Sequence, residues 1–115
     1  MNKKGKQLLS ELEEIVLLAL IKLGSESYGV PIHQTIEDAS GRFISIGSIY
    51  AALDRMERSG FVTSRMGEAT SERGGRAKKF FKVEGAGMLA LKEAERIRRA
   101  ILPKRRLLPV EGSVE

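Results

Sequence analysis

The chain has 115 residues, enough for one compact domain, and 42% of them are hydrophobic, which excludes a disordered protein. Lys and Arg number 20 against 15 Asp and Glu, and this net charge of +5 favours a polyanionic partner. The absence of cysteine excludes disulfides, Cys-ligated zinc, iron–sulfur clusters and a thiol nucleophile. No apolar run reaches the ~20 residues that cross a bilayer, so we expect no membrane segment and a cytoplasmic location.

The first predicted helix starts after Ser10, which forms a capping-box pattern with Glu13. Its apolar residues recur with helical spacing, and others make its middle apolar on nearly every side. Such a helix is buried on more than one side, and in so short a chain we expect a second copy of the protein to cover part of it. The residues concerned are Leu12, Ile15, Val16, Leu17, Leu18, Ala19, Ile21 and Leu23.

Two further helices are predicted in quick succession. Ser27 is the candidate N-cap of the second helix, Pro31 suits its first turn, and Gly41 suits its C-terminal end. Ser45 is the candidate N-cap of the third helix. The third helix repeats apolar residues at three-, four- and three-residue steps, which predicts one buried stripe: Ile46, Ile49, Leu53 and Met56.

The period then changes to that of strands. Residues 61–66 and 79–83 are rich in β-branched and aromatic side chains, and a polar segment containing Gly74-Gly75 separates them. This pattern predicts a β-hairpin with a long tip, and Arg73 and Arg76 flank the glycine pair. The alternative interpretation is a solvated loop whose charges only increase solubility.

A fourth helix is predicted from about Gly87 to Leu102, and Pro103 ends it. Taken together, the elements predict a mostly helical α+β fold, a winged helix-turn-helix with three helices, a two-stranded wing and a C-terminal dimerisation helix. We expect the winged domain in residues 1–86, the dimerisation helix in 87–103 and a flexible tail in 104–115. The dimer contacts expected on the first and fourth helices are Leu12, Ile15, Met88, Leu91, Ile97 and Ile101.

Two further patterns do not predict catalysis. Gly85-Ala86-Gly87-Met88-Leu89-Ala90 matches a dinucleotide fingerprint, but the second parallel strand and its acidic residue are missing, so the glycines are interpreted as a tight turn. His33 is the single histidine, and one histidine cannot form a metal site. We therefore expect no metal, no cofactor and no enzymatic activity.

The third helix and the hairpin carry the functional prediction. A helix that reads duplex DNA buries one face and presents small and cationic side chains to the major groove. A flexible cationic hairpin tip can enter the narrow minor groove of A·T-rich DNA. We therefore expect a homodimer that binds double-stranded DNA; the alternative is a protein–protein interaction module. The expected DNA contacts are Ser45, Ser48, Tyr50, Ala51, Arg55, Arg58, Arg73, Arg76 and Lys78.

Three segments together resemble the PadR family of bacterial transcriptional regulators: Tyr28–Ile32, Ser45–Gly60 and Gly74–Phe81. The resemblance implies a dimeric winged-helix protein, usually a repressor, with a small-molecule effector of unknown identity in some members. It also implies that Ser45, Ser48 and Tyr50 lie against DNA, with Arg73 and Arg76 in the wing. The sequence departs from the family pattern in the order Tyr28-Gly29, in Glu84 where a Thr is usual, and in its short C-terminal region.

Overall fold

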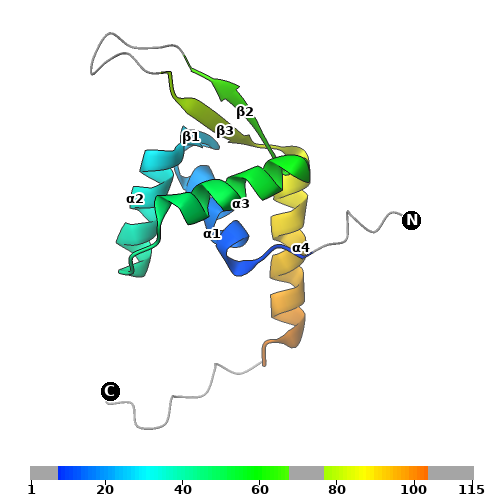
Figure 1. The fold of residues 1–115 in the computed structure, drawn as a ribbon. Helices are drawn as coiled ribbons and strands as arrows, with labels where there is room; N and C mark the ends of the chain where they lie inside the picture. Colours follow the sequence, from blue (N-terminus) through cyan, green and yellow to red (C-terminus); the bar gives the residue numbers. More distant parts are fainter. Residues whose placement is uncertain (1–7, 68–76, 104–115) are drawn as a thin grey trace.

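The computed structural model describes residues 8–67 and 77–103, and it has a mostly helical α+β fold (Figure 1). Four helices and three strands follow one another as α1 (Glu11–Lys22), β1 (Glu26–Tyr28), α2 (Gly29–Ser40), α3 (Ile46–Arg58), β2 (Val62–Met66), β3 (Lys79–Val83) and α4 (Gly85–Ile101). α1, α2 and α3 pack together, the sheet lies at one end of them, and α4 extends away along one side (Figure 1). None of the described helices has the length and apolarity that a membrane crossing needs.

α1 is the central helix of the core. Its capping box is present, because the Ser10 hydroxyl accepts a hydrogen bond from the Glu13 amide and the Glu13 carboxylate accepts one from the Ser10 amide. Leu17 and Leu20 are fully buried against α2, α3 and the sheet. Leu18 points the other way and is 55% exposed, so α1 has an apolar side that the described residues do not cover.

The turn between α2 and α3 is fixed by glycine and histidine. Gly41 ends α2 with a left-handed backbone (φ 67°), as its sequence position predicted. His33 Nε2 donates a hydrogen bond to the backbone carbonyl of Ile44 at 2.6 Å, which ties α2 to the segment that leads into α3. The histidine thus has a structural partner in the turn that sets the angle between the two helices.

The sheet has one more strand than the predicted hairpin. Its order is β1-β3-β2, with β3 antiparallel to both neighbours. The interpretation of Ser27 as a helix N-cap was wrong: Ser27 lies in β1, opposite Phe81, and is buried. The N-cap of α2 is Tyr28, whose side chain makes no capping hydrogen bond.

α4 starts earlier than predicted, at Gly85 rather than Gly87, and ends at Ile101. Gly87 is buried where the helix crosses the start of β2, and a Cβ at this position would overlap the backbone carbonyl of Phe61. Close packing of helix on strand therefore explains this glycine. The tight turn expected from the glycines of the Gly85–Ala90 motif was wrong, because Gly85 and Gly87 both lie within α4. The predicted tail, residues 104–115, lies outside the described residues.

Candidate nucleic-acid interface

α3 lies across one face of the molecule with one side buried and the other open (Figure 1). Ile49, Ala52, Leu53 and Met56 form its buried side. Ile46 was predicted to join this stripe, but it is 38% exposed because it lies in the first turn, beyond the edge of the core. At 100° per residue, the positions opposite the buried side form what we call the outer face of α3: Gly47, Ala51, Asp54 and Arg58, all exposed.

The N-terminus of α3 is capped by Ser45, as predicted. The Ser45 hydroxyl accepts a hydrogen bond from the Ser48 amide at 3.1 Å, and the hydroxyls of the two serines lie 2.8 Å apart. Both serines are exposed, as is Ala51 one turn further on. Gly47, Ser48 and Ala51 therefore give the first two turns of α3 a strip of small exposed residues, where the backbone is open to a close approach.

Arg55 lies at the edge of α3 that faces α1, and it is not a free cation. Its Nε donates to Glu13 Oε2 at 3.0 Å, while Glu13 Oε1 accepts from the Ser10 amide at 2.8 Å. The Arg55 side chain remains 47% exposed, so part of the guanidinium stays open to solvent. Arg58, one turn on, has no ion pair among the described residues.

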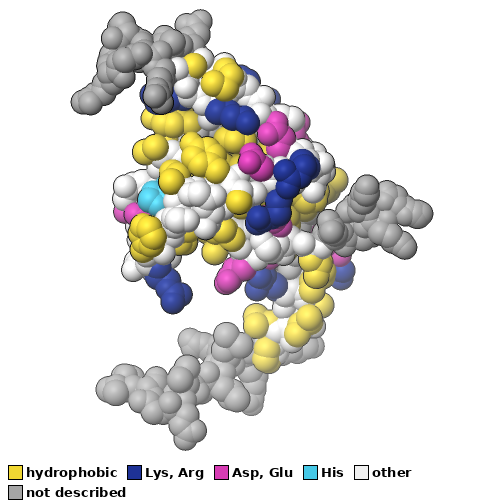
Figure 2. Space-filling view, in the orientation of Figure 1, with side chains coloured by type: hydrophobic (Ala, Val, Ile, Leu, Met, Phe, Trp, Pro, Cys, Tyr) yellow, Lys and Arg dark blue, Asp and Glu magenta, His cyan; other side chains and the backbone are white. Residues whose placement is uncertain are grey.

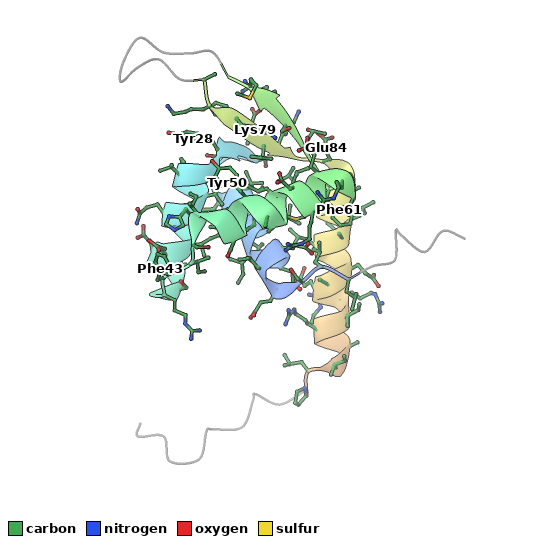
Figure 3. The ribbon with its side chains drawn as sticks, viewed as in Figure 1. Tyr28, Phe43, Tyr50, Phe61, Lys79 and Glu84 are labelled. Atoms are coloured by element: carbon green, nitrogen blue, oxygen red, sulfur yellow. The ribbon has the colours of Figure 1, made fainter. Side chains whose placement is uncertain are left out.

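Tyr50 lies at the opposite edge of α3, towards the sheet, and Figure 3 shows it between α3 and the start of α2. Its ring centroid is 6.4 Å from that of Phe81, and its hydroxyl end lies against Gly29, where a Cβ would overlap it. About a third of the side chain remains exposed. Tyr50 thus packs α3 on α2 and β3. No sequence pattern indicated that Gly29 is the residue beneath it.

The strands of the hairpin carry cations stacked on aromatic rings. Arg65 lies over Phe80 (4.8 Å to the ring centroid), and its Nε donates to Glu26 Oε2 at 2.8 Å across β3. This hydrogen bond and the charge of Arg65 hold the pKa of the Glu26 carboxyl below its ordinary value. Lys78 lies over the ring of Tyr28, just before β3 begins and next to the tip of the hairpin. Arg73 and Arg76 fall outside the described residues.

The cationic side chains share a face with α3. Figure 2 shows Lys and Arg near the middle and the upper part of the face that α3 crosses, with a few acidic side chains among them. Phe43 lies in the turn between α2 and α3, and its side chain is 82% exposed (Figure 3). The structure thus places Ser48, Ala51, Arg55 and Arg58 on the open part of α3 and Ser45 at its N-cap, with Tyr50 at the edge of the helix and Lys78 on the hairpin.

A separate apolar surface runs along α1 and α4. One groove of about 400 Å³ lies between α1 and α2 and is lined by Ile15, Leu18 and Ile36 among others. A second groove of about 460 Å³ lies between α1 and α4, with Leu18, Ile21, Met88 and Leu91 in its wall. Of the other residues predicted to form a dimer, Leu12 packs against the core, Ile97 is half-buried and Ile101 is largely exposed.

Sequence reasoning missed the roles of three residues. Glu13 was interpreted only as a helix-capping acid, yet it also binds Arg55 from α3. His33 and Gly29 fix the positions of α3 relative to α2, and neither contact is local in sequence. Within residues 8–67 and 77–103 no three His, Cys, Asp or Glu side chains lie close enough together to hold a metal ion.

The arrangement is that of a winged-helix DNA-binding protein, and the comparisons with known proteins agree. The model of the PadR-like family of transcriptional regulators matches residues 17–93, more than half of the chain. The chain therefore belongs to the PadR-like family of transcriptional regulators, as the sequence resemblance predicted. A comparison with curated proteins found no match.

Several solved structures have the same fold. A PadR family transcription regulator from hypervirulent Clostridium difficile superposes with a TM-score of 0.66 at 23% identity, covering 80% of this chain and 91% of that one. A PadR-like transcriptional regulator from Bacillus cereus gives a TM-score of 0.61 at 26% identity, covering 78% and 82%. F93 from STIV, a winged-helix DNA-binding protein, gives a TM-score of 0.61 at 20% identity, covering 81% and 92%.

Proposed function

We propose that this chain is a cytoplasmic, homodimeric repressor that recognises a near-palindromic operator in double-stranded DNA. The observation that carries the proposal is the exposed side of α3, which has small residues in its first turns and arginines in its last ones. Such a helix can approach the floor of the major groove at its N-terminal half and contact phosphates or guanine edges with its C-terminal half.

The proposed DNA contacts divide by type. Ser45, Ser48 and Ala51 lie where α3 would approach base edges, while Arg55 and Arg58 would bind phosphate or guanine. Tyr50 is proposed as an edge contact, since a third of its side chain is open. Lys78, next to the hairpin tip, is proposed to contact DNA beside the flanking minor groove, which Arg73 and Arg76 would enter.

The proposed dimer uses α4, residues 85–101, and the uncovered side of α1. Leu18 lies between two apolar grooves, and Met88 and Leu91 line one of them. A two-fold axis through this surface would cover Leu18 and place two copies of α3 about one DNA turn apart, ~34 Å. The wall of the groove between α1 and α4 also carries Glu14 and Arg98, which are paired at 3.1 Å within one chain.

The experiment is recovery of bound fragments from sheared genomic DNA, followed by titration of the recovered site at several salt concentrations. A regulator of this kind enriches a near-palindromic sequence and binds it with a steep salt dependence. Replacing Arg73 and Arg76 together with Ala is expected to reduce the slope of log K against log salt by about 4 for a dimer, since each cation releases about one counterion. The matched control replaces Arg96 and Arg99, which pair with Glu93 and Glu95 on α4.

The competing function is a protein–protein interaction module. That module would enrich no DNA sequence and would bind random and recovered fragments equally weakly. An equal salt slope for the wild type and the Arg73/Arg76 variant would show that the protein binds DNA without a contribution from these two arginines.

A further inference from the structure

The outer face of α3 contains one carboxylate without a partner. Asp54 is exposed and forms no hydrogen bond or ion pair with any described residue. The neighbouring acids are all occupied: Glu57 accepts from the Ser64 hydroxyl at 2.6 Å and Glu13 from Arg55 at 3.0 Å. Asp54 is therefore available to an outside ligand in a way that the other acids near α3 are not.

The position of Asp54 on α3 also favours a contact with DNA. It lies one turn after Ala51 and two turns after Gly47, on the line of α3 that points directly away from the buried Leu53 and Ala52 side. The small residues on the N-terminal side of Asp54 let this line of the helix come close to a groove floor. An aspartate side chain is short, so only such a close approach would let its carboxylate reach a base edge.

A carboxylate at this place is unfavourable in a general DNA-binding surface. It repels the phosphates of every sequence, so it lowers affinity without selectivity unless a hydrogen-bond donor of the DNA faces it. In the major groove the amino groups of cytosine and adenine are the base donors, whereas guanine and thymine present acceptors that would repel a carboxylate. Adenine also presents its N7 acceptor beside the amino group, which suits an amide better than a carboxylate.

We propose that Asp54 is a base-specificity residue that accepts a hydrogen bond from the N4 amino group of a cytosine, once in each half-site. The inference rests on the proposed function, because it requires α3 to lie in the major groove. Discrimination is expected mainly against guanine and thymine at that position, where the carboxylate would face acceptor atoms. Affinity for random DNA is reduced by the same charge.

The test is selection of binding sites from a randomised duplex library with three proteins: the wild type, Asp54→Asn and Asp38→Asn. The first variant keeps the shape of the side chain and removes its charge. The second removes an equal charge from α2, where Asp38 accepts a hydrogen bond from Gln34 within the same helix. Thermal melting checks that both variants fold, and their exposed positions predict unchanged midpoints.

The expected result is a change at one symmetry-related pair of positions only. The wild type should prefer cytosine there by roughly tenfold, the range of a specific base contact. Asp54→Asn should lose that preference and shift towards adenine, which an amide can bind through N6 and N7, while the other positions keep theirs. Asp38→Asn should reproduce the wild-type site.

Two other results have distinct meanings. If Asp54→Asn selects the wild-type site and only binds all DNA more tightly, Asp54 is a source of general repulsion and the specificity role is overturned. If the wild type itself enriches no sequence, the proposed function fails, and the role of Asp54 fails with it.

Discussion

Arg55 of α3 and Glu13 of α1 are 42 residues apart in sequence, and their side chains are joined by a 3.0 Å hydrogen bond between Nε and Oε2. Glu13 is only 14% exposed and also completes the capping box of α1. One carboxylate thus stabilises the start of α1 and restrains an arginine of the exposed helix. A cation that is already paired has less to gain from a phosphate, because that interaction must replace the existing one.

Glu13→Gln is therefore expected to strengthen DNA binding. The amide oxygen can still accept from the Ser10 backbone, so the capping box is retained, but the charge that restrains Arg55 is gone. The salt slope should increase by up to about 1 per site, and the free energy of unfolding should fall by about 1 kcal/mol, as for an ion pair whose arginine is half exposed. Affinity titrations and chemical denaturation measure the two effects.

Two variants control this experiment. Glu11→Gln removes the same charge from the same turn without touching Arg55, so it reports the general electrostatic change. Arg55→Ala should weaken DNA binding while leaving the protein folded. Equal gains in affinity from Glu11→Gln and Glu13→Gln would show that the ion pair does not restrain Arg55.

Gly29→Ala should destabilise the protein although the residue lies at a helix start, where alanine is ordinarily tolerated. The added methyl group would overlap the end of the Tyr50 ring, and overpacking of this kind costs about 1–3 kcal/mol. Replacing the tyrosine ring with a shorter side chain, in the double variant Gly29→Ala/Tyr50→Leu, should recover part of the loss. A double-mutant cycle by urea denaturation measures this recovery. Strictly additive losses would show that the two residues do not contact each other in solution.

Glu26 should titrate below the ordinary range of a glutamate. Its hydrogen bond to Arg65 favours the ionised form in the folded state, so the folded pKa is lower than the unfolded one. The resulting stabilisation is fully present above the unfolded pKa and is lost as the pH falls through the folded pKa. NMR titration of the Glu26 carboxyl should show its pKa rising towards the ordinary value in Arg65→Gln. An identical Glu26 pKa in both proteins would show that Arg65 does not lower it.

The proposed dimer predicts that charge at the end of α4 separates the subunits. Replacing Ile97 and Ile101 with Asp should convert a dimer into a monomer at micromolar concentration, since unpaired carboxylates would enter an apolar contact. Light scattering measures this directly. Ala100→Asp, an exposed position in the same turn, is the control and should remain dimeric. A wild-type monomer that binds its operator tightly would contradict the dimer.

Sequence patterns predicted the elements that depend on local chemistry. The capping box at Ser10, the N-cap at Ser45 and the C-cap at Gly41 were found because each is decided by one residue and the few backbone groups nearest to it. The strands β2 and β3 were found from their β-branched and aromatic residues. The family was recognised for a related reason, since its motifs lie within continuous segments.

What the sequence did not show depends on contacts between distant segments. β1 has three residues and no strand pattern of its own, and it forms because β3 offers it a free edge. The pairing of Arg55 with Glu13 and the packing of Tyr50 on Gly29 arise from the crossing of α3 over α1 and α2. The periodicity of α3 identified its exposed side, but it gave no sign of which exposed side chains are already occupied.

The contact between Gly87 and the carbonyl of Phe61 leaves no room for any side chain at that point of α4. In a saturation mutagenesis library, position 87 should therefore retain glycine almost alone, while its neighbours Ala86 and Met88, both exposed, accept many residue types. A residue without functional groups would then be among the least replaceable in the helix. The position in α4 that tolerates no substitution would mark where the backbone of the helix contacts the segment that leads into β2. Selection for folding alone would be enough to keep glycine at that position.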